Sequence, residues 1–159
     1  MSASSHNKLP LDYSVVEFEP LEEKWNEYEF SDGTKIKFRV VLMRLTLERN
    51  APPNQYNVNA NNLVTVFASS SERGEPSAPM TSNDIEQAEK FEVRPITTNE
   101  NWNSYRIIST DDIIKIKYVA STFFRLKDKY DQFGEPMYHI LGGPLVVPQP
   151  RISKSRRTP

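Results

Sequence analysis

The sequence contains no cysteine and only two histidines, and its positive charges do not outnumber its negative ones. The absence of Cys excludes a disulfide scaffold, a thiolate metal site and a cysteine nucleophile. With 20 Lys and Arg against 21 Asp and Glu, the chain as a whole lacks the basic excess of a typical nucleic-acid-binding domain. No apolar stretch approaches the roughly 20 residues that a membrane-spanning helix needs.

The first ten residues, Met1–Pro10, are polar and contain no apolar segment of the kind found in a signal peptide. The sequence therefore predicts a cytoplasmic protein without a membrane span. Its 159 residues suit one domain or two very small ones. An apolar fraction of 37% beside a charged fraction of 26% is compatible with a globular fold.

An internal repeat organises the chain. Both Trp residues stand in the same setting, Trp25-Asn26-Glu27-Tyr28 and Trp102-Asn103-Ser104-Tyr105. The match extends on either side, because residues 17–20 resemble residues 92–95 and residues 36–39 resemble residues 114–117. The offset grows from 75 to 82 residues along the chain. We interpret this as a tandem duplication of a unit of roughly 65–80 residues.

Each unit has the pattern of β-strands. Residues 35–40 alternate between charged and apolar side chains, and residues 40–45 are apolar on both faces, which predicts a long bent strand that becomes buried. Asp32-Gly33 before it predicts a hairpin turn. In the second copy the matching turn, residues 109–112, has no Gly, but Asp also tolerates turn positions.

Two further strands are expected at the end of each copy, with a break between them. In the first copy, the turn-forming composition of Asn59–Asn62 would separate strands at Tyr56–Val58 and Leu63–Ala68. In the second copy, Gly142-Gly143 would separate Met137–Leu141 from Pro144–Val147. Between the copies, N-cap candidates at residues 81–84 predict one short helix over about Asn83–Lys90.

The predicted fold is therefore all-β: a tandem duplication of a small SH3-like barrel or curled meander, with one short helix between the copies. One merged barrel built from both copies is the main alternative. The expected segments are a disordered N-terminus at 1–10, a first β repeat at 11–68, a linker with the helix at 69–90, a second β repeat at 91–150 and a basic disordered tail at 151–159.

The candidate binding residues fall into three groups. The aromatic residues of the repeated motif are Trp25, Tyr28, Trp102 and Tyr105. In a strand the Trp and the Tyr point to opposite faces, so they pack in the core or lie at a binding groove. The basic strand faces consist of Lys35, Lys37, Arg39, Lys115 and Lys117. They either follow phosphates or form solvated faces on which Lys protects a sheet edge against aggregation.

The third group is the tail, with Arg151, Lys154, Arg156 and Arg157. It carries four positive charges, which leaves −5 on residues 1–150 out of a total of −1. Such a tail on an acidic body can contact nucleic acid, an anionic surface or an acidic partner, or can simply keep the chain in solution.

Catalysis has little support in the sequence. His139 lies in a predicted strand, where a structural role is the simpler interpretation, and the familiar nucleophile, phosphate-loop and zinc motifs do not occur. The spacing of Asp128 and Asp131 does not match a Ca²⁺ loop. We therefore expect no cofactor and no metal.

Three function classes remain open. The leading hypothesis is a non-enzymatic β-rich interaction or structural module that binds a protein or self-assembles, for example by accepting a partner strand at a sheet edge. The alternative is a nucleic-acid-binding module that uses the basic strand face and the basic tail. The third is an enzyme with a carboxylate site between the repeats.

Overall fold

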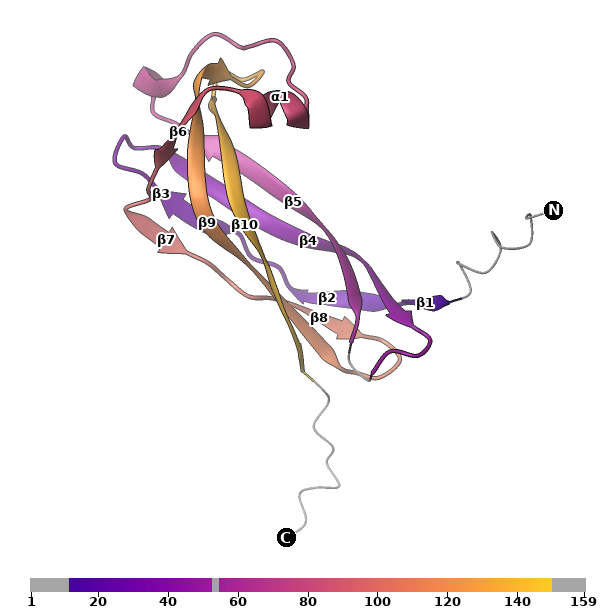
Figure 1. Cartoon of the computed structure of the whole chain (residues 1–159). Helices are drawn as coiled ribbons and strands as arrows, with labels where there is room; N and C mark the ends of the chain where they lie inside the picture. The colour runs from indigo at the N-terminus through magenta and orange to yellow at the C-terminus, as the bar shows by residue number, and fades with distance from the viewer. Residues whose placement is uncertain (1–11, 53–54, 150–159) are drawn as a thin grey trace, which may run out of the picture.

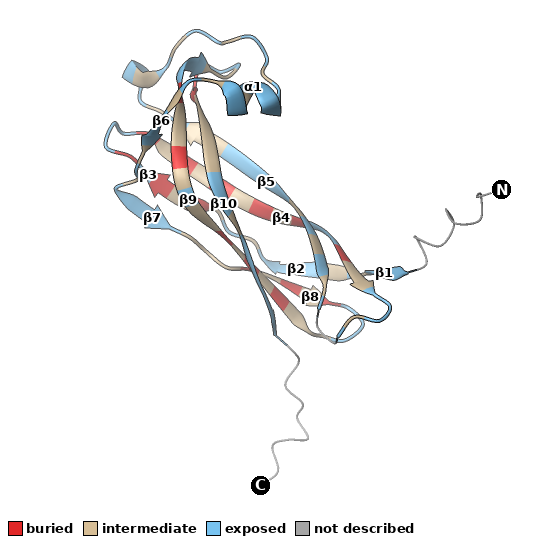
Figure 2. Ribbon diagram, viewed as in Figure 1, coloured by how far each residue is buried: buried red, intermediate tan, exposed pale blue. Residues whose placement is uncertain are grey.

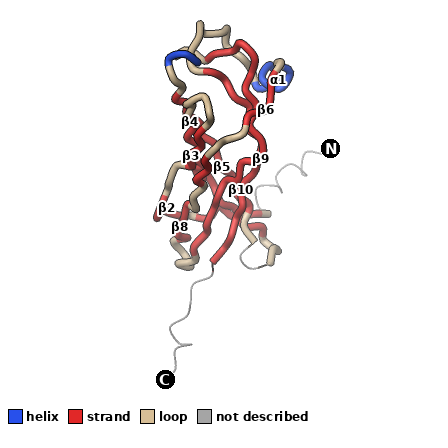
Figure 3. Tube along the Cα trace, turned by 90° about the vertical axis from the view of Figure 1, so that its left-hand side faces the viewer, coloured by secondary structure: helices blue, strands red, loops and turns tan. Residues whose placement is uncertain are grey.

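Two antiparallel sheets lie face to face in the computed structural model, which describes residues 12–52 and 55–149 (Figures 1 and 3). Each sheet contains five strands, and two short helices lie in the segment that joins the halves of the chain. The all-β prediction is confirmed. The expected SH3-like barrels are not confirmed, and the expected disordered ends, 1–10 and 151–159, lie outside the described residues.

One long central strand organises each sheet. In the first, called sheet A, β4 pairs with β5 on one side and with β1 and β3 on the other, and β7 pairs with β3. The bounds are β1 Tyr13–Val16, β3 Asn26–Glu29, β4 Lys35–Glu48, β5 Asn57–Phe67 and β7 Thr97–Asn99.

The second sheet, called sheet B, has the same pairing pattern. Its central strand β9 pairs with β10 on one side and with β8 and β6 on the other, and β2 pairs with β8. The bounds are β2 Phe18–Glu22, β6 Lys90–Val93, β8 Asn103–Ile107, β9 Ile113–Tyr130 and β10 Pro136–Gln149.

The two halves of the chain exchange a strand. β2 belongs to the first half of the sequence but pairs in sheet B, whereas β7 belongs to the second half but pairs in sheet A. The chain crosses between the sheets at each Trp, over residues 23–25 and 100–102. The sheets are therefore interlocked, and separating them would break both pairings.

Both predicted hairpin turns are confirmed. Gly33 has a φ of +85°, and the amide of Thr34 donates to Oδ1 of Asp32 at 2.9 Å. In the second turn Asp111 takes the left-handed conformation, with a φ of +62°, and its amide donates to the carbonyl of Ile107 at 2.9 Å. Asp replaces Gly there because its short polar side chain tolerates this conformation.

The predicted breaks in the last strands are wrong, because β5 and β10 are continuous. The irregularity lies in the register with the central strand instead. Met43 of β4 has no partner between the pairs of Leu42 and Arg44, and Ser121 of β9 likewise has none. The turn-forming composition of 59–62 misleads because those residues pair with β4 throughout. Gly142 is needed for close packing, since a Cβ there would lie 2.2 Å from the carbonyl oxygen of Val119.

The bulge also corrects the prediction that the second half of β4 is buried on both faces. The alternating side chains from Ile36 to Leu42 are buried, and the next buried one is Leu45. One extra residue moves the buried positions from even to odd numbers, and leaves Met43 53% exposed. This run of mostly apolar residues therefore marks the point where the alternation of buried and exposed side chains shifts by one residue.

A short helix, α1 (Ser82–Gln87), lies between the halves as predicted, and ends three residues earlier than expected. Thr81 and Asp84 form a capping box, in which each side chain accepts from the other residue's amide. A short 3-10 helix, η3 (Ser70–Glu72), precedes it.

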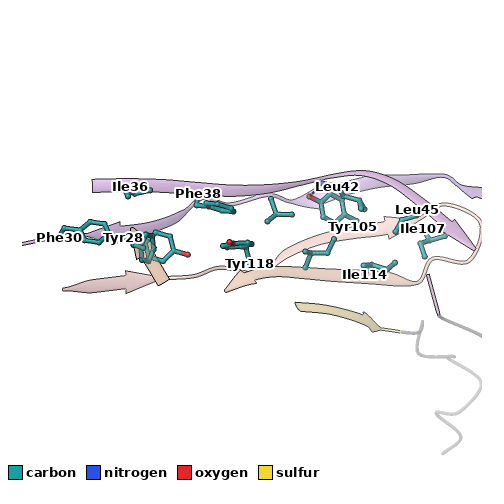
Figure 4. Close-up of a cluster of buried hydrophobic side chains, with 13 residues drawn as sticks. Tyr28, Phe30, Ile36, Phe38, Leu42, Leu45, Tyr105, Ile107, Ile114 and Tyr118 are labelled. Carbon is teal, nitrogen blue, oxygen red and sulfur yellow. Dashed lines mark hydrogen bonds between the residues drawn. The ribbon is translucent and has the colours of Figure 1, made fainter. Parts of the chain in front are cut away.

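The hydrophobic core fills the space between the sheets (Figure 4). Its aromatic rings meet across the sheets, with Phe38 stacked on Tyr118 at 4.0 Å and Tyr28 against Phe123 at 4.8 Å between centroids. The other buried members are Phe30, Ile36, Val40, Leu42, Leu45, Tyr105, Ile107, Ile114 and Ile116. Such burial is the main favourable term of folding.

Candidate functional site

The repeated aromatic motif builds the interior of the molecule. Tyr28 and Tyr105 are 0% and 1% exposed, and each Trp is only half-buried. The guanidinium of Arg39 lies 5.8 Å from the centroid of the Trp25 ring, and Nζ of Lys117 lies 5.1 Å from that of Trp102. No binding groove is formed by the two Tyr residues, because their rings lie inside the core.

The buried Asn of each motif connects the sheets. Nδ2 of Asn26, in sheet A, donates to the carbonyl of Tyr118 in sheet B at 2.9 Å, and its Oδ1 accepts from the amide of Asn101 at 2.8 Å. An amide side chain with both ends used in this way fixes two segments of backbone.

Asn103 makes the equivalent bonds from the other sheet. Its Nδ2 donates to the carbonyl of Val40 at 3.1 Å, and its Oδ1 accepts from the amide of Lys24 at 2.7 Å. These carbonyls belong to stretches of the central strands that face a gap in the ladder: β4 between its pairings with β3 and β1, and β9 between its pairings with β8 and β6. The side chains thus satisfy backbone groups that no neighbouring strand reaches.

Two glutamates complete this arrangement, and neither lies in the matched segments of the internal repeat. The hydroxyl of Tyr28 donates to Oε2 of Glu100 at 2.8 Å, and the same oxygen accepts from the amide of Ala120 at 2.8 Å. The hydroxyl of Tyr105 donates to Oε2 of Glu23 at 2.8 Å. Each Glu precedes its Trp by two residues, so extending the repeat match upstream would have found both.

These phenols are held in the neutral form. Burial, together with the hydrogen bond to Glu100, raises the pKa of Tyr28 well above its usual range. Burial likewise raises the pKa of Tyr105, with a further contribution from the Glu23 carboxylate. A neutral phenol that donates to a carboxylate can link the two segments that carry these groups.

The basic face on sheet A is paired with acidic residues of β3 and of the segment that precedes it. Lys35 lies 3.5 Å from Glu29, and Lys37 lies 3.5 Å from Glu27. Arg39 lies 3.0 Å from Glu23. Each of these three basic side chains therefore has an acidic partner. On sheet B, Lys115 is opposite Ser104 in the register, and Lys117 covers Trp102. The basic tail residues Arg151, Lys154, Arg156 and Arg157 lie outside the described residues.

The long edge strands β5 and β10 differ from this surface because they carry no charged residues. In the part of the chain that the structure describes, β5 pairs only with β4 and β10 only with β9. Neither strand contains Asp, Glu, Lys or Arg. Many residues of both strands are exposed, as the pale blue parts of the ribbon show (Figure 2). The exposed apolar residues are Leu63, Val64, Phe67, Leu141, Leu145, Val146 and Val147.

The two strands lie on the same side of the molecule. The amide of Ala68, just after β5, donates to Oε2 of the buried Glu135, just before β10, at 2.9 Å. At the other end, Tyr56 and Val146 line one cavity of about 200 Å³. This side of the sandwich therefore has two long, uncharged edges, whereas natural sheets usually protect an edge with charge, proline or a cover.

Only β10 carries one of these protections. Pro144 and Pro148 have no N–H, and proline is accommodated in a sheet where its nitrogen faces away from the neighbouring strand. β5 contains no proline, so each of its eleven residues has a backbone N–H. β4 and β9 are central strands, so Lys35 and Lys37 do not lie on an edge. β5 is thus the candidate binding edge.

Other places in the fold give weaker candidates. Two cavities have volumes of about 500 Å³. One of them lies beside β6 and is lined by Glu92, Arg94 and Ser121 among others; its charged residues, Glu92 and Arg94, pair with each other at 3.0 Å. His139 lies 6.4 Å from the Phe124 ring, and its Nδ1 has no hydrogen-bond partner. Among residues 12–52 and 55–149, no group of three His, Asp or Glu could hold a metal ion.

No helix within those same residues is long and apolar enough to cross a membrane. Comparison of the chain with protein-family models, with curated proteins and with solved structures finds no match. The candidate site therefore rests on the residues and the geometry described above.

Proposed function

We propose that this protein is a non-enzymatic interaction module that binds protein by accepting an extended strand at the β5 edge. The observation that carries the proposal is β5 itself: eleven residues without a charge or a proline, at the edge of a sheet, in a chain that is 26% charged. In β-augmentation the backbone of the edge supplies hydrogen bonds, and side-chain positions on alternate faces supply selectivity.

The interior supports this use of the edge. The network around Asn26, Asn103, Tyr28 and Tyr105 holds the two sheets together, so that β5 rests against a central strand that cannot easily slide. A preorganised edge binds with less loss of conformational entropy than a mobile segment would.

We also propose that the chain arose by tandem duplication. The support is that equivalent residues of the two halves make equivalent contacts, as Asn26 with Tyr118 and Asn103 with Val40 do. The cytoplasmic location expected from the sequence stays a prediction.

The nucleic-acid-binding alternative has less support, because the basic side chains on sheet A are paired with Glu27 and Glu29 of β3 and with Glu23. A catalytic site between the repeats also has less support. The carboxylates there, Glu23 and Glu100, are engaged by tyrosine hydroxyls.

The test is a selection of extended peptides from a displayed library on the purified protein, followed by binding to two variants. Val64→Lys places a charge on β5, and Val147→Lys places one on β10; these Val side chains are 47% and 41% exposed, so both variants should fold. We expect peptides that lose at least about tenfold in affinity for the first variant, which is about 1.4 kcal/mol. Equal binding to both variants, or no selected peptide, would refute the proposed edge.

A further inference from the structure

We infer that the strand that occupies β5 is the β5 strand of a second copy, paired antiparallel about Asn62 in a two-fold symmetric dimer. This inference depends on the proposed function, because it names the partner of the same edge. A two-fold interface requires a surface that is complementary to itself. When the eleven residues of two β5 strands pair over their full length, Asn62, the central residue of Asn57–Phe67, lies on the two-fold axis and faces itself.

The face of β5 that points to the core, which includes Asn62 opposite the buried Val40, pairs like with like in this register. Its residues are those opposite the buried side chains of β4, such as Val64 opposite Phe38 and Val66 opposite Ile36. In the dimer Val58 would face Val66 of the second copy, and Ala60 would face Val64. Val64 is 47% exposed in the single chain although its partner Phe38 is buried, so a neighbouring strand would cover apolar surface there.

The outer face is compatible with the same register. Asn59 would face Thr65 of the second copy, and Asn61 would face Leu63. None of these residues is charged, so the pairing places no like charges opposite each other, which would weaken a strand pair. A strand that binds its own copy avoids this cost most simply by carrying no charge.

Other pairings are less favourable. A register shifted toward Phe67 would have to extend beyond that residue, where the chain turns into η3 (Ser70–Glu72) and its Ala68 amide is bonded to Glu135. Self-pairing of β10 would meet Pro144 and Pro148, which supply no donor. The full-length pairing of β5 uses about 37 Å of edge, from eleven residues at roughly 3.4 Å each.

The first experiment uses the absence of cysteine from the natural chain. Asn62→Cys would place the new thiol directly opposite its own copy, because opposed residues of an antiparallel pair have Cα atoms roughly 4.5–5.5 Å apart, within the range that a disulfide spans. Asn59→Cys is the matched control: it is an exposed Asn on the same strand, and its thiols would lie about 20 Å apart in the dimer. We expect mild oxidation to give a covalent dimer of the first variant and not of the second.

The second experiment measures association by sedimentation velocity over about three decades of concentration from the micromolar range upward. The unmodified chain should form dimers, and Asn62→Lys and Asn62→Asp should each raise the dissociation constant about fivefold, since each places like charges opposite each other. A mixture of these two variants should associate at least as tightly as the unmodified chain, because opposite charges then meet. Asn59→Lys, which would face Thr65, should have little effect.

A chain that stays monomeric, equal cross-linking of the two Cys variants, or the absence of recovery in the mixture would each overturn the dimer. The peptide selection separates this failure from that of the proposed function. If peptides bind at β5 while the chain is monomeric, the edge is an interaction site for another protein. If the chain is monomeric and no peptide binds in a manner sensitive to Val64→Lys, both proposals fail.

Discussion

The side-chain amide of Asn26 donates to the backbone carbonyl of Tyr118, 92 residues away and in the other sheet, at 2.9 Å. This bond spans the core at the gap in the β9 ladder, and Asn103 makes its counterpart to Val40. The interior of this protein is thus held by specific polar links as well as by apolar packing. One of these links ends on β4, the strand with which the edge strand β5 pairs.

Removing one of these amides should destabilise the fold. Asn26→Ala would leave the buried carbonyl of Tyr118 and the partly buried amide of Asn101 without their partner. We expect a loss of about 1–3 kcal/mol for each stranded group, measured by urea unfolding. Asn59→Ala, on the exposed part of β5, is the control and should change little. Equal stability of the two variants would contradict a structural role for Asn26.

A matched pair of glycines tests the bulge in sheet B. Gly142→Ala would bring a Cβ within 2.2 Å of the carbonyl oxygen of Val119, so we expect a loss of about 1–3 kcal/mol from the forced shift of the backbone. Gly143→Ala meets no atom within 4 Å and should be nearly neutral. The measurement is the midpoint of thermal unfolding for both variants. If they unfold at the same temperature, the close packing at Gly142 is not a constraint.

The buried tyrosines predict a loss of stability in alkali. Because burial raises the pKa of Tyr28 and Tyr105 in the folded chain, the unfolded chain releases these phenol protons first, near pH 10. Stability should therefore be complete below about pH 10 and should fall above it, by about 1.4 kcal/mol per pH unit for each such tyrosine.

The check is urea unfolding as a function of pH in Tyr28→Phe. This variant should be less stable near neutral pH, because it loses the bond to Glu100, and its stability should fall less steeply above about pH 10. Tyr13→Phe, at a side chain that is 47% exposed, should keep the slope of the unmodified chain. An unchanged slope in Tyr28→Phe would show that Tyr28 does not resist ionisation.

The local features of the fold could be predicted from the sequence, because they depend on neighbouring residues. The alternation of residues 35–40, the turn at Asp32-Gly33 and the helix before Lys90 each follow from short-range preferences. The phase change at Met43 could not be predicted. It depends on which residues of β5 lie opposite, and apolar residues on both sides of the bulge conceal it.

The exchange of β2 and β7 between the sheets is also invisible to local reasoning, because it is a matter of pairing between distant segments. The candidate site was only partly foreseen. The repeat makes the Trp and Tyr residues conspicuous, but both Tyr rings lie in the core, and the Glu residues that accept their hydrogen bonds lie outside the matched segments. The uncharged composition of β5 was readable, whereas its position at an edge was not.

The most direct measurement of the central claim is amide hydrogen exchange of the unmodified chain at low and at high protein concentration. The account predicts that residues 57–67 of β5 become more protected as concentration rises, while residues 144–149 of β10 do not change. Exchange in β5 that is independent of concentration would contradict the pairing of this edge with a second copy.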